Sequence, residues 1–148
     1  MEWRSEQVVP AKPDRHLGRS MRRGFLCRCP NCGEGALFRA YQKPVDNCAV
    51  CGEDMSHQRA DDAPPYFTMV IVGHIVVPIM LTVVLATEWS NLTHMMIWLP
   101  LTAALTLGLL QPVKGATIAL QWALYMHGFD KDAAPDTMAE GYLRRETA

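Results

Sequence analysis

The sequence predicts a mostly α-helical membrane protein: a two-helix transmembrane hairpin with an N-terminal cytosolic zinc ribbon (a short β-hairpin) and an amphipathic interfacial helix. Three observations predict it: two C-x-x-C-G turns, two uncharged stretches of 25 residues, and a polar stripe on the apolar segment that follows them. The expected parts are a disordered basic arm (1–24), the zinc ribbon (25–57), a linker (58–65), the transmembrane hairpin (66–111), the interfacial helix (112–127) and a disordered tail (128–148).

Four of the five cysteines stand in the two C-x-x-C-G turns, and fifteen residues separate Cys32 from Cys48. This is the ligand pattern of a zinc ribbon, in which four thiolates surround one ion tetrahedrally. The glycine after each turn supplies the backbone angles that direct amide groups toward the sulfurs. One structural Zn²⁺ is therefore the expected cofactor, with Cys29, Cys32, Cys48 and Cys51 as ligands. Cys27 is left over, either as a free thiol beside the site or as a substitute ligand.

The spacer between the turns holds Leu37, Phe38, Tyr41 and Val45, which suffice for a short hairpin with a few apolar side chains over the metal. About thirty residues cannot bury a self-sufficient core, so the ion is expected to supply folding energy. Two other metals are alternatives. Similar cysteine turns hold iron, although this spacer is short for such a site. Thioethers suit Cu(I), but the methionines are scattered: Met69, Met80, Met95 and Met96.

Two long stretches lack any charged residue, Ala63–Thr87 and Trp89–Val113, and only Glu88 separates them. A helix rises about 1.5 Å per residue, so a hydrocarbon core of about 30 Å needs roughly 20 residues. Each stretch is long enough to span a bilayer. We expect the spans at residues 66–87 and 94–111.

The distribution of basic residues predicts the topology. Ten of the fourteen Lys and Arg residues precede the first span, and the turn at residues 88–93 contains none. The positive-inside rule then favours both termini in the cytosol, where cysteines stay reduced. The first 25 residues lack an apolar signal-peptide core, so the first stretch is expected to be an anchor. The basic arm either contacts anionic lipid headgroups or is a solvated tail.

Beyond Pro112, the side chains Lys114, Thr117, Gln121 and Tyr125 recur every three or four residues. They form one polar stripe on an apolar helix that is too short to span. We interpret it as an interfacial helix that lies on the membrane after a kink at the proline. The alternative is a straight continuation of the second span, docked on the ribbon.

Two pairings are expected in and near the bilayer. His74 lies about 12 Å inside the first span, at the depth of Thr102 and Thr106 on the second. It either donates a hydrogen bond that holds the hairpin together or takes part in proton or metal transfer. At the cytosolic edge, Lys114 either pairs with Asp62 or extends its amine toward the interface.

Several motifs occur in a fixed order: Arg28-Cys-Pro-x-Cys-Gly-x-Gly-x-Leu-Phe38, Cys48-x-x-Cys-Gly52, Asp61-Asp-Ala-Pro64, Gly73-His-Ile-Val-Val77 and Leu110-Gln-Pro-x-Lys-Gly115. In this set, over about residues 22–130, the chain resembles the small bacterial membrane proteins grouped as domain of unknown function 983. Cys27 is not part of that pattern. The resemblance implies a multi-pass protein of the bacterial inner membrane and brings no assigned activity. Members are often encoded beside cytochrome c oxidase subunits and assembly factors.

The sequence lacks the motifs of several other functions. The chain shows no Ser-His-Asp set, phosphate-binding loop or paired catalytic carboxylates, so we expect no enzyme. Residues 1–65 carry ten basic and nine acidic side chains, which argues against nucleic-acid binding. We expect a non-enzymatic adaptor or assembly factor whose partners are the lipid bilayer and another membrane protein or respiratory-complex subunit. A homo-oligomer is left open, and the alternative function is a metal or redox carrier at the membrane.

Overall fold

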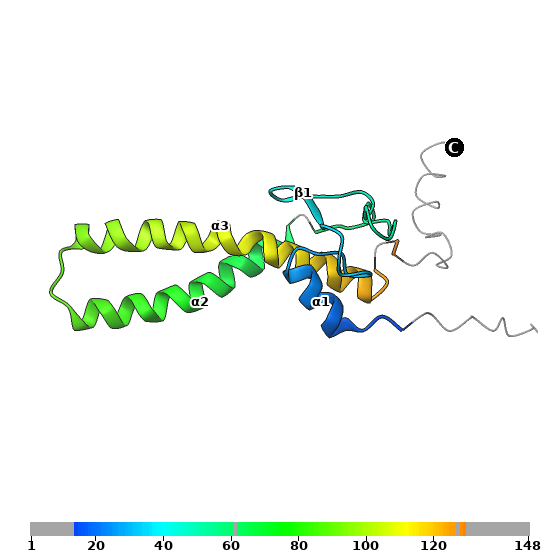
Figure 1. Ribbon diagram of the computed structural model, residues 1–148. Coiled ribbons are helices and arrows are strands. Elements are labelled where there is room, and N and C mark those ends of the chain that lie inside the picture. Colours follow the sequence, from blue (N-terminus) through cyan, green and yellow to red (C-terminus); the bar gives the residue numbers. More distant parts are fainter. Residues whose placement is uncertain (1–13, 61, 127, 130–148) are drawn as a thin grey trace, which may run out of the picture.

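The computed structural model describes residues 14–60, 62–126 and 128–129 of the 148. Helices α2 and α3 form a long antiparallel hairpin, and α1 and the two strands gather beside the C-terminal part of α3 (Figure 1). The mostly helical fold with a short antiparallel sheet confirms the predicted class. In chain order the elements are α1 (Leu17–Phe25), β1 (Phe38–Ala40), β2 (Lys43–Pro44), α2 (Ala63–Ala86) and α3 (Asn91–Ala123).

The two hairpin helices are long and apolar enough to cross a membrane. Only 11% of the most apolar window of α2 and 6% of that of α3 is buried inside the protein, whereas the core helix of a soluble protein is mostly buried. Proline at the first turn of α2 suits a helix start, because that turn needs no N–H donor there. At the start of α3, the Ser90 side chain accepts a hydrogen bond from Thr93 N.

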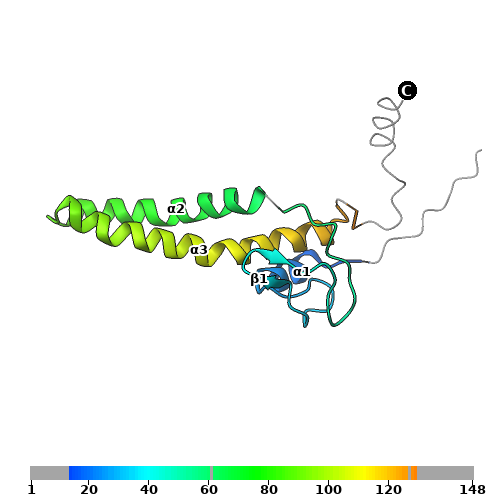
Figure 2. The same cartoon turned by 90° about the horizontal axis from the view of Figure 1, so that it is seen from above.

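Helix α3 passes through Pro112 without a break and runs to Ala123. The expectation of a separate interfacial helix at 112–127 is therefore wrong in its start, and the alternative of a continuous helix agrees with the structure. Proline removes one hydrogen bond, that to the Gly108 carbonyl, and the helix continues beyond it. The last eleven residues lie against α1 and the ribbon (Figure 2). They include all the buried residues of α3.

Helix α1 occupies part of the segment 1–24 that was expected to be disordered. A nine-residue helix is marginal by itself, and here contacts with α3 stabilise it, since Ser20 and Gly24 are buried at that contact. No local sequence pattern indicates this helix, because its packing partner lies about ninety residues further along the chain. Residues 1–13 and 130–148 lie outside the described residues, so the predicted arm and tail are not tested there.

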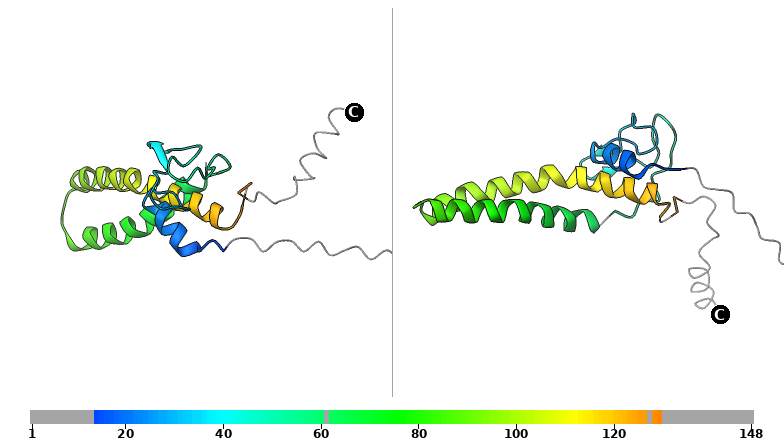
Figure 3. Two further views of the ribbon diagram at one scale, coloured as in Figure 1. Left: turned by 45° about the vertical axis from the view of Figure 1, so that its right-hand side comes forward. Right: turned by 90° about the horizontal axis from the view of Figure 1, so that it is seen from below.

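The ribbon has no core of its own. Its strands pair with Phe38 opposite Pro44, and two isolated bridges, Arg28 with Ala36 and Asn47 with Asp54, flank the two cysteine turns. Leu37 and Met55 are fully buried in the same cluster as Ile118 of α3. The further views in Figure 3 show the ribbon lying along one side of this helix. The predicted shortage of apolar residues is therefore compensated by α3.

Candidate metal centre

Each cysteine turn closes on its glycine. Gly33 N donates to the Cys29 carbonyl and Gly52 N to the Cys48 carbonyl, both at 2.9 Å. The two glycines have φ of +80° and +71°, which is the left-handed region that a side chain disfavours. These paired turns are the local structure that the sequence predicted for metal ligands.

The four turn cysteines converge. Their Sγ atoms all lie within 4.8 Å of one another, with Cys29 and Cys51 3.7 Å apart and Cys32 and Cys48 3.8 Å apart. A tetrahedral ion with Zn–S bonds of about 2.3 Å requires sulfurs about 3.8 Å apart. The site therefore fits a zinc-ribbon-like motif that can hold one ion. Cys27 is not among the converging ligands.

The protein environment shifts the pKa values of the site's thiols in different directions. Burial raises the pKa of Cys29, and partial desolvation also raises the pKa of Cys51, although the Cys51 residue is exposed as a whole. The pKa of Cys32 is lowered to about 6, because the backbone N–H groups of Gly35 and Glu34 point at its sulfur. A metal ion must therefore displace protons from Cys29 and Cys51 at neutral pH, whereas Cys32 is already largely a thiolate.

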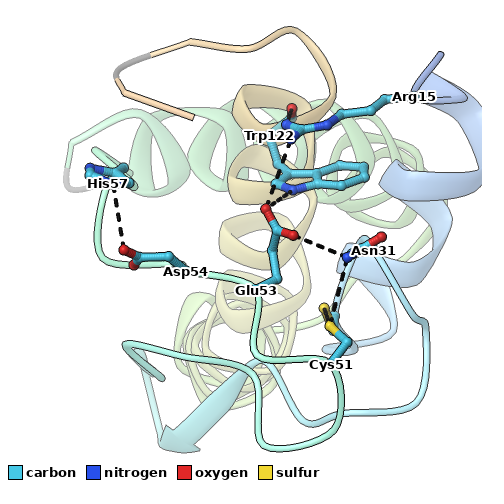
Figure 4. Close-up of polar contacts among 8 residues, drawn as sticks. Arg15, Asn31, Cys51, Glu53, Asp54, His57 and Trp122 are labelled. Atoms are coloured by element: carbon cyan, nitrogen blue, oxygen red, sulfur yellow. Dashed lines mark hydrogen bonds and ion pairs between the residues drawn. The ribbon is translucent and has the colours of Figure 1, made fainter. Parts of the chain in front are cut away.

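A carboxylate beside the site joins the second cysteine turn to α3 (Figure 4). Asn31 Nδ2 lies 3.8 Å from Cys51 Sγ and donates to Glu53 Oε2 at 3.0 Å. The other oxygen of Glu53 accepts a hydrogen bond from Trp122 Nε1 at 3.0 Å and lies 3.8 Å from Arg15 Nη2. One side chain therefore contacts the first cysteine turn, the end of α3 and the segment before α1.

Two arginines bind backbone carbonyls around this carboxylate. Arg15 Nη1 donates to the Trp122 carbonyl at 2.6 Å, and its guanidinium lies 4.1 Å from the centre of the Trp122 ring. Arg23 Nη1 donates to the Asn31 carbonyl at 2.5 Å, within the first cysteine turn. Positive charge is thus close to a site whose four thiolates would give zinc a formal charge of −2.

No sequence motif pointed to Asn31, Glu53, Trp122 or Arg15. Glu53 directly follows a cysteine turn, and Trp122 lies on a helix that was read as interfacial. Because 69 residues separate these two, no local pattern pairs them. Gln121 and Arg59 form a second long-range pair. The Gln121 side-chain amide donates to the Arg59 carbonyl (2.9 Å) and accepts from Arg59 N (3.0 Å).

The expected intramembrane pairing does not form. His74 Nδ1 donates to the carbonyl of Val70 in its own helix at 2.8 Å, and Thr106 Oγ1 donates to that of Thr102 at 2.7 Å. Each side chain thus bonds a carbonyl one turn earlier in its own helix, as serine and threonine side chains commonly do. The two threonines line a cavity of about 560 Å³ between α2 and α3, together with Met69 and Met80. His74 is exposed on a different face of α2.

The expected ion pair at the membrane edge is also replaced. Lys114 Nζ donates to the Gln42 carbonyl at 3.0 Å, and among the described residues no ion pair joins it to Asp62. The turn between β1 and β2 approaches α3, where Tyr41 also donates to the Leu107 carbonyl at 2.6 Å. This long-range approach was not visible in the sequence. Asp61 lies outside the described residues.

The family comparison gives one match. The model of a family described as Protein of unknown function (DUF983) matches residues 38–122, which is more than half of the chain. The matched segment holds the second cysteine turn, α2 and nearly all of α3. No curated protein and no solved structure matches the chain.

Proposed function

We infer that this chain, which belongs to the family described as Protein of unknown function (DUF983), is a non-enzymatic adaptor or assembly factor of the bacterial inner membrane. In this proposal α2 and α3 anchor the chain, both termini lie in the cytosol, and the ribbon carries one structural zinc ion. The partner is another membrane protein or a respiratory-complex subunit, with cytochrome c oxidase as the candidate complex.

The observation that supports an adaptor best is the fixed attachment of the ribbon to α3. The ribbon shares its buried cluster with Ile118 and Trp122, and Glu53 connects its cysteine turns to the same helix. A partner bound to the ribbon would therefore contact a surface whose position is set by the hairpin. Four thiolates also fill a tetrahedral site, which is typical of structural zinc, whereas catalytic zinc keeps one position open.

The test compares two tryptophan variants in a mild-detergent affinity purification followed by mass spectrometry. Trp122→Ala should detach the ribbon from α3 but leave the cysteines in place. The matched control is Trp89→Ala, because Trp89 is half-exposed before α3, at the opposite end of that helix. We expect oxidase or other respiratory subunits to co-purify with the wild type and with Trp89→Ala, and to be lost with Trp122→Ala at unchanged zinc content. A wild-type chain that retains no membrane protein would contradict the adaptor.

A metal or redox carrier is the second candidate, and the exposure of Cys51 favours it. An exposed ligand thiolate gives a partner direct access to the ion. Zinc that passes to a chelator within minutes, or that is substoichiometric after gentle purification, would support a carrier. Zinc retained for hours in excess chelator would support the structural role.

A further inference from the structure

An apolar groove of about 270 Å³ opens between α1, α2 and α3. It is lined from α1 by Met21 and Phe25, from α2 by Phe67 and Ile71, and from α3 by Val113 and Ala116. All three helices contribute apolar side chains, and Phe25 and Phe67 are each about half exposed. The groove is thus an unfilled apolar surface that continues the outer face of the hairpin.

The outer face of α1 next to this groove is basic. Arg19, Arg22 and Arg23 line a cleft of about 470 Å³ with Gly18, and no acidic side chain from the described part of the chain lines it. Arg23 already donates a hydrogen bond to a carbonyl of the first cysteine turn. Asp14 lines a neighbouring cleft together with Arg19 and Arg23. Arg22 is exposed and lies one helical turn before Phe25, so the basic and apolar surfaces meet on one helix.

The direction of α1 sets the depth of both surfaces. Arg15 contacts Trp122 near the end of α3, whereas Gly24 contacts Gly115, so α1 runs toward the hairpin. Phe67 lies in the second turn of α2, at the level where aromatic side chains gather at membrane interfaces. In the proposed orientation the groove therefore reaches the acyl region and Arg22 lies at the headgroup level.

We propose that these two surfaces form a binding site for one anionic glycerophospholipid. An acyl chain fills the groove between α1, α2 and α3, and the phosphate binds Arg22 and Arg19, whose planar guanidinium groups match phosphate oxygens. The occupant must be both apolar and anionic, since each surface matches one half of such a lipid. The proposal rests on the membrane location given above and is independent of the adaptor's partner.

The first experiment measures lipid binding to the purified full-length chain by native mass spectrometry, in a neutral detergent. Dioleoyl phosphatidylglycerol is compared with dioleoyl phosphatidylcholine. We expect the wild type to prefer phosphatidylglycerol, and the double variant Arg19→Gln/Arg22→Gln to bind it about 25-fold more weakly, at about fivefold per arginine. Arg59→Gln is the matched control, because Arg59 is exposed and lines neither the groove nor the basic cleft. It should change the binding less than twofold.

The second experiment tests the groove. Ala116→Leu should fill it and weaken dioleoyl phosphatidylglycerol binding, while the short-chain dihexanoyl lipid is little affected. Ala104→Leu adds the same volume on the exposed face of α3 and should change neither. Zinc content and thermal unfolding show that each variant is folded.

Several results would overturn the lipid site. They are equal affinity for the two headgroups in the wild type, an equal loss in the Arg59→Gln control, and unchanged binding in a folded Arg19→Gln/Arg22→Gln protein. Each concerns the purified chain alone. Co-purification of a membrane partner with a chain that shows no lipid preference would reject the lipid site and retain the adaptor, and the reverse result would reject the adaptor only.

Discussion

Gly24 of α1 and Gly115 of α3 occupy each other's side-chain space: a Cβ on either residue would overlap the carbonyl oxygen of the other. The obstacle is backbone on both sides, so a rotamer change cannot relieve it. The two helices reach this distance only because neither residue has a side chain. Since the first cysteine turn follows α1 closely, this contact also fixes where the ribbon begins.

Replacement of Gly24 by alanine should destabilise the packing of α1 on α3 by about 1–3 kcal/mol, the usual cost of overpacking. The matched control is Gly18→Ala on the same helix, where an added Cβ meets nothing within 4 Å. That change should stabilise α1 by up to about 1 kcal/mol through helix propensity. Thermal unfolding in detergent, followed by zinc release, measures both. Equal stability of the two variants would show that the close crossing is not needed.

The purified chain should contain about one zinc ion per molecule by elemental analysis. Cys48→Ser should abolish stoichiometric binding, because it removes one of four converging ligands. Cys27→Ser should retain the metal, since Cys27 lies outside the sulfur cluster. A red protein with one iron per chain would overturn the zinc assignment, and loss of metal in Cys27→Ser would overturn the ligand set.

Zinc affinity should rise with pH. Binding requires thiolates, and the raised pKa values of Cys29 and Cys51 keep both protonated at neutral pH. At least two protons are therefore displaced per ion, which corresponds to an affinity gain of about 100-fold per pH unit around neutrality. Below about pH 6 the dependence should become steeper, because Cys32 also gains a proton. Competition with a chelator of known pH dependence measures the slope, and a flat profile would contradict the assigned protonation states.

The proposed topology places the turn between α2 and α3 outside the cytosol. An alkaline phosphatase fused at Asn91 should be exported and active, whereas one fused after Gly128 should be inactive. Immunoblots of both fusions control for expression. The opposite activity pattern would place the cysteines in an oxidising compartment, where free thiolates are not maintained.

Substitution of His74 distinguishes a structural side chain from one that moves protons or binds metal. Its hydrogen bond goes to Val70 in its own helix, so His74→Asn, His74→Gln and His74→Leu should all accumulate normally, with a loss of about 0.6 kcal/mol or less. Protein level and a deletion phenotype should be measured together in the three variants. Loss of function in all three at normal protein level would establish a chemical role for the imidazole.

The sequence was sufficient to predict the parts whose signals are local. The geometry of each cysteine turn depends on only five consecutive residues, the two cysteines and the glycine among them. The length of an uncharged stretch can be counted directly in the sequence. The parts that it did not predict depend on contacts between distant segments. Helix α1 needs the surface of α3, and Glu53 meets Trp122 only after the ribbon has docked.

The two expected pairings that the structure replaces have the same physical cause. Depth matching placed His74 beside Thr102 and Thr106, but a polar side chain can bond a carbonyl one turn away without any partner helix. Lys114 was paired by charge with Asp62, but the turn at Gln42 offers it a carbonyl. Sequence position gives the depth of a side chain and does not give the direction in which it points.

The unbroken course of α3 has a mechanical consequence. Its 33 residues form a rod of about 50 Å, and roughly 20 of them suffice to cross a hydrocarbon core. In the proposed orientation the remaining part projects beyond the membrane, and the ribbon with its cysteine turns packs against it. A tilt of the membrane-spanning part therefore displaces the ribbon. A change of about 10° in tilt, imposed by bilayer thickness or by a neighbouring protein, would move the cytosolic end by about 3.5 Å over a projection of about 20 Å. The position of the metal centre would then report the local thickness of the membrane.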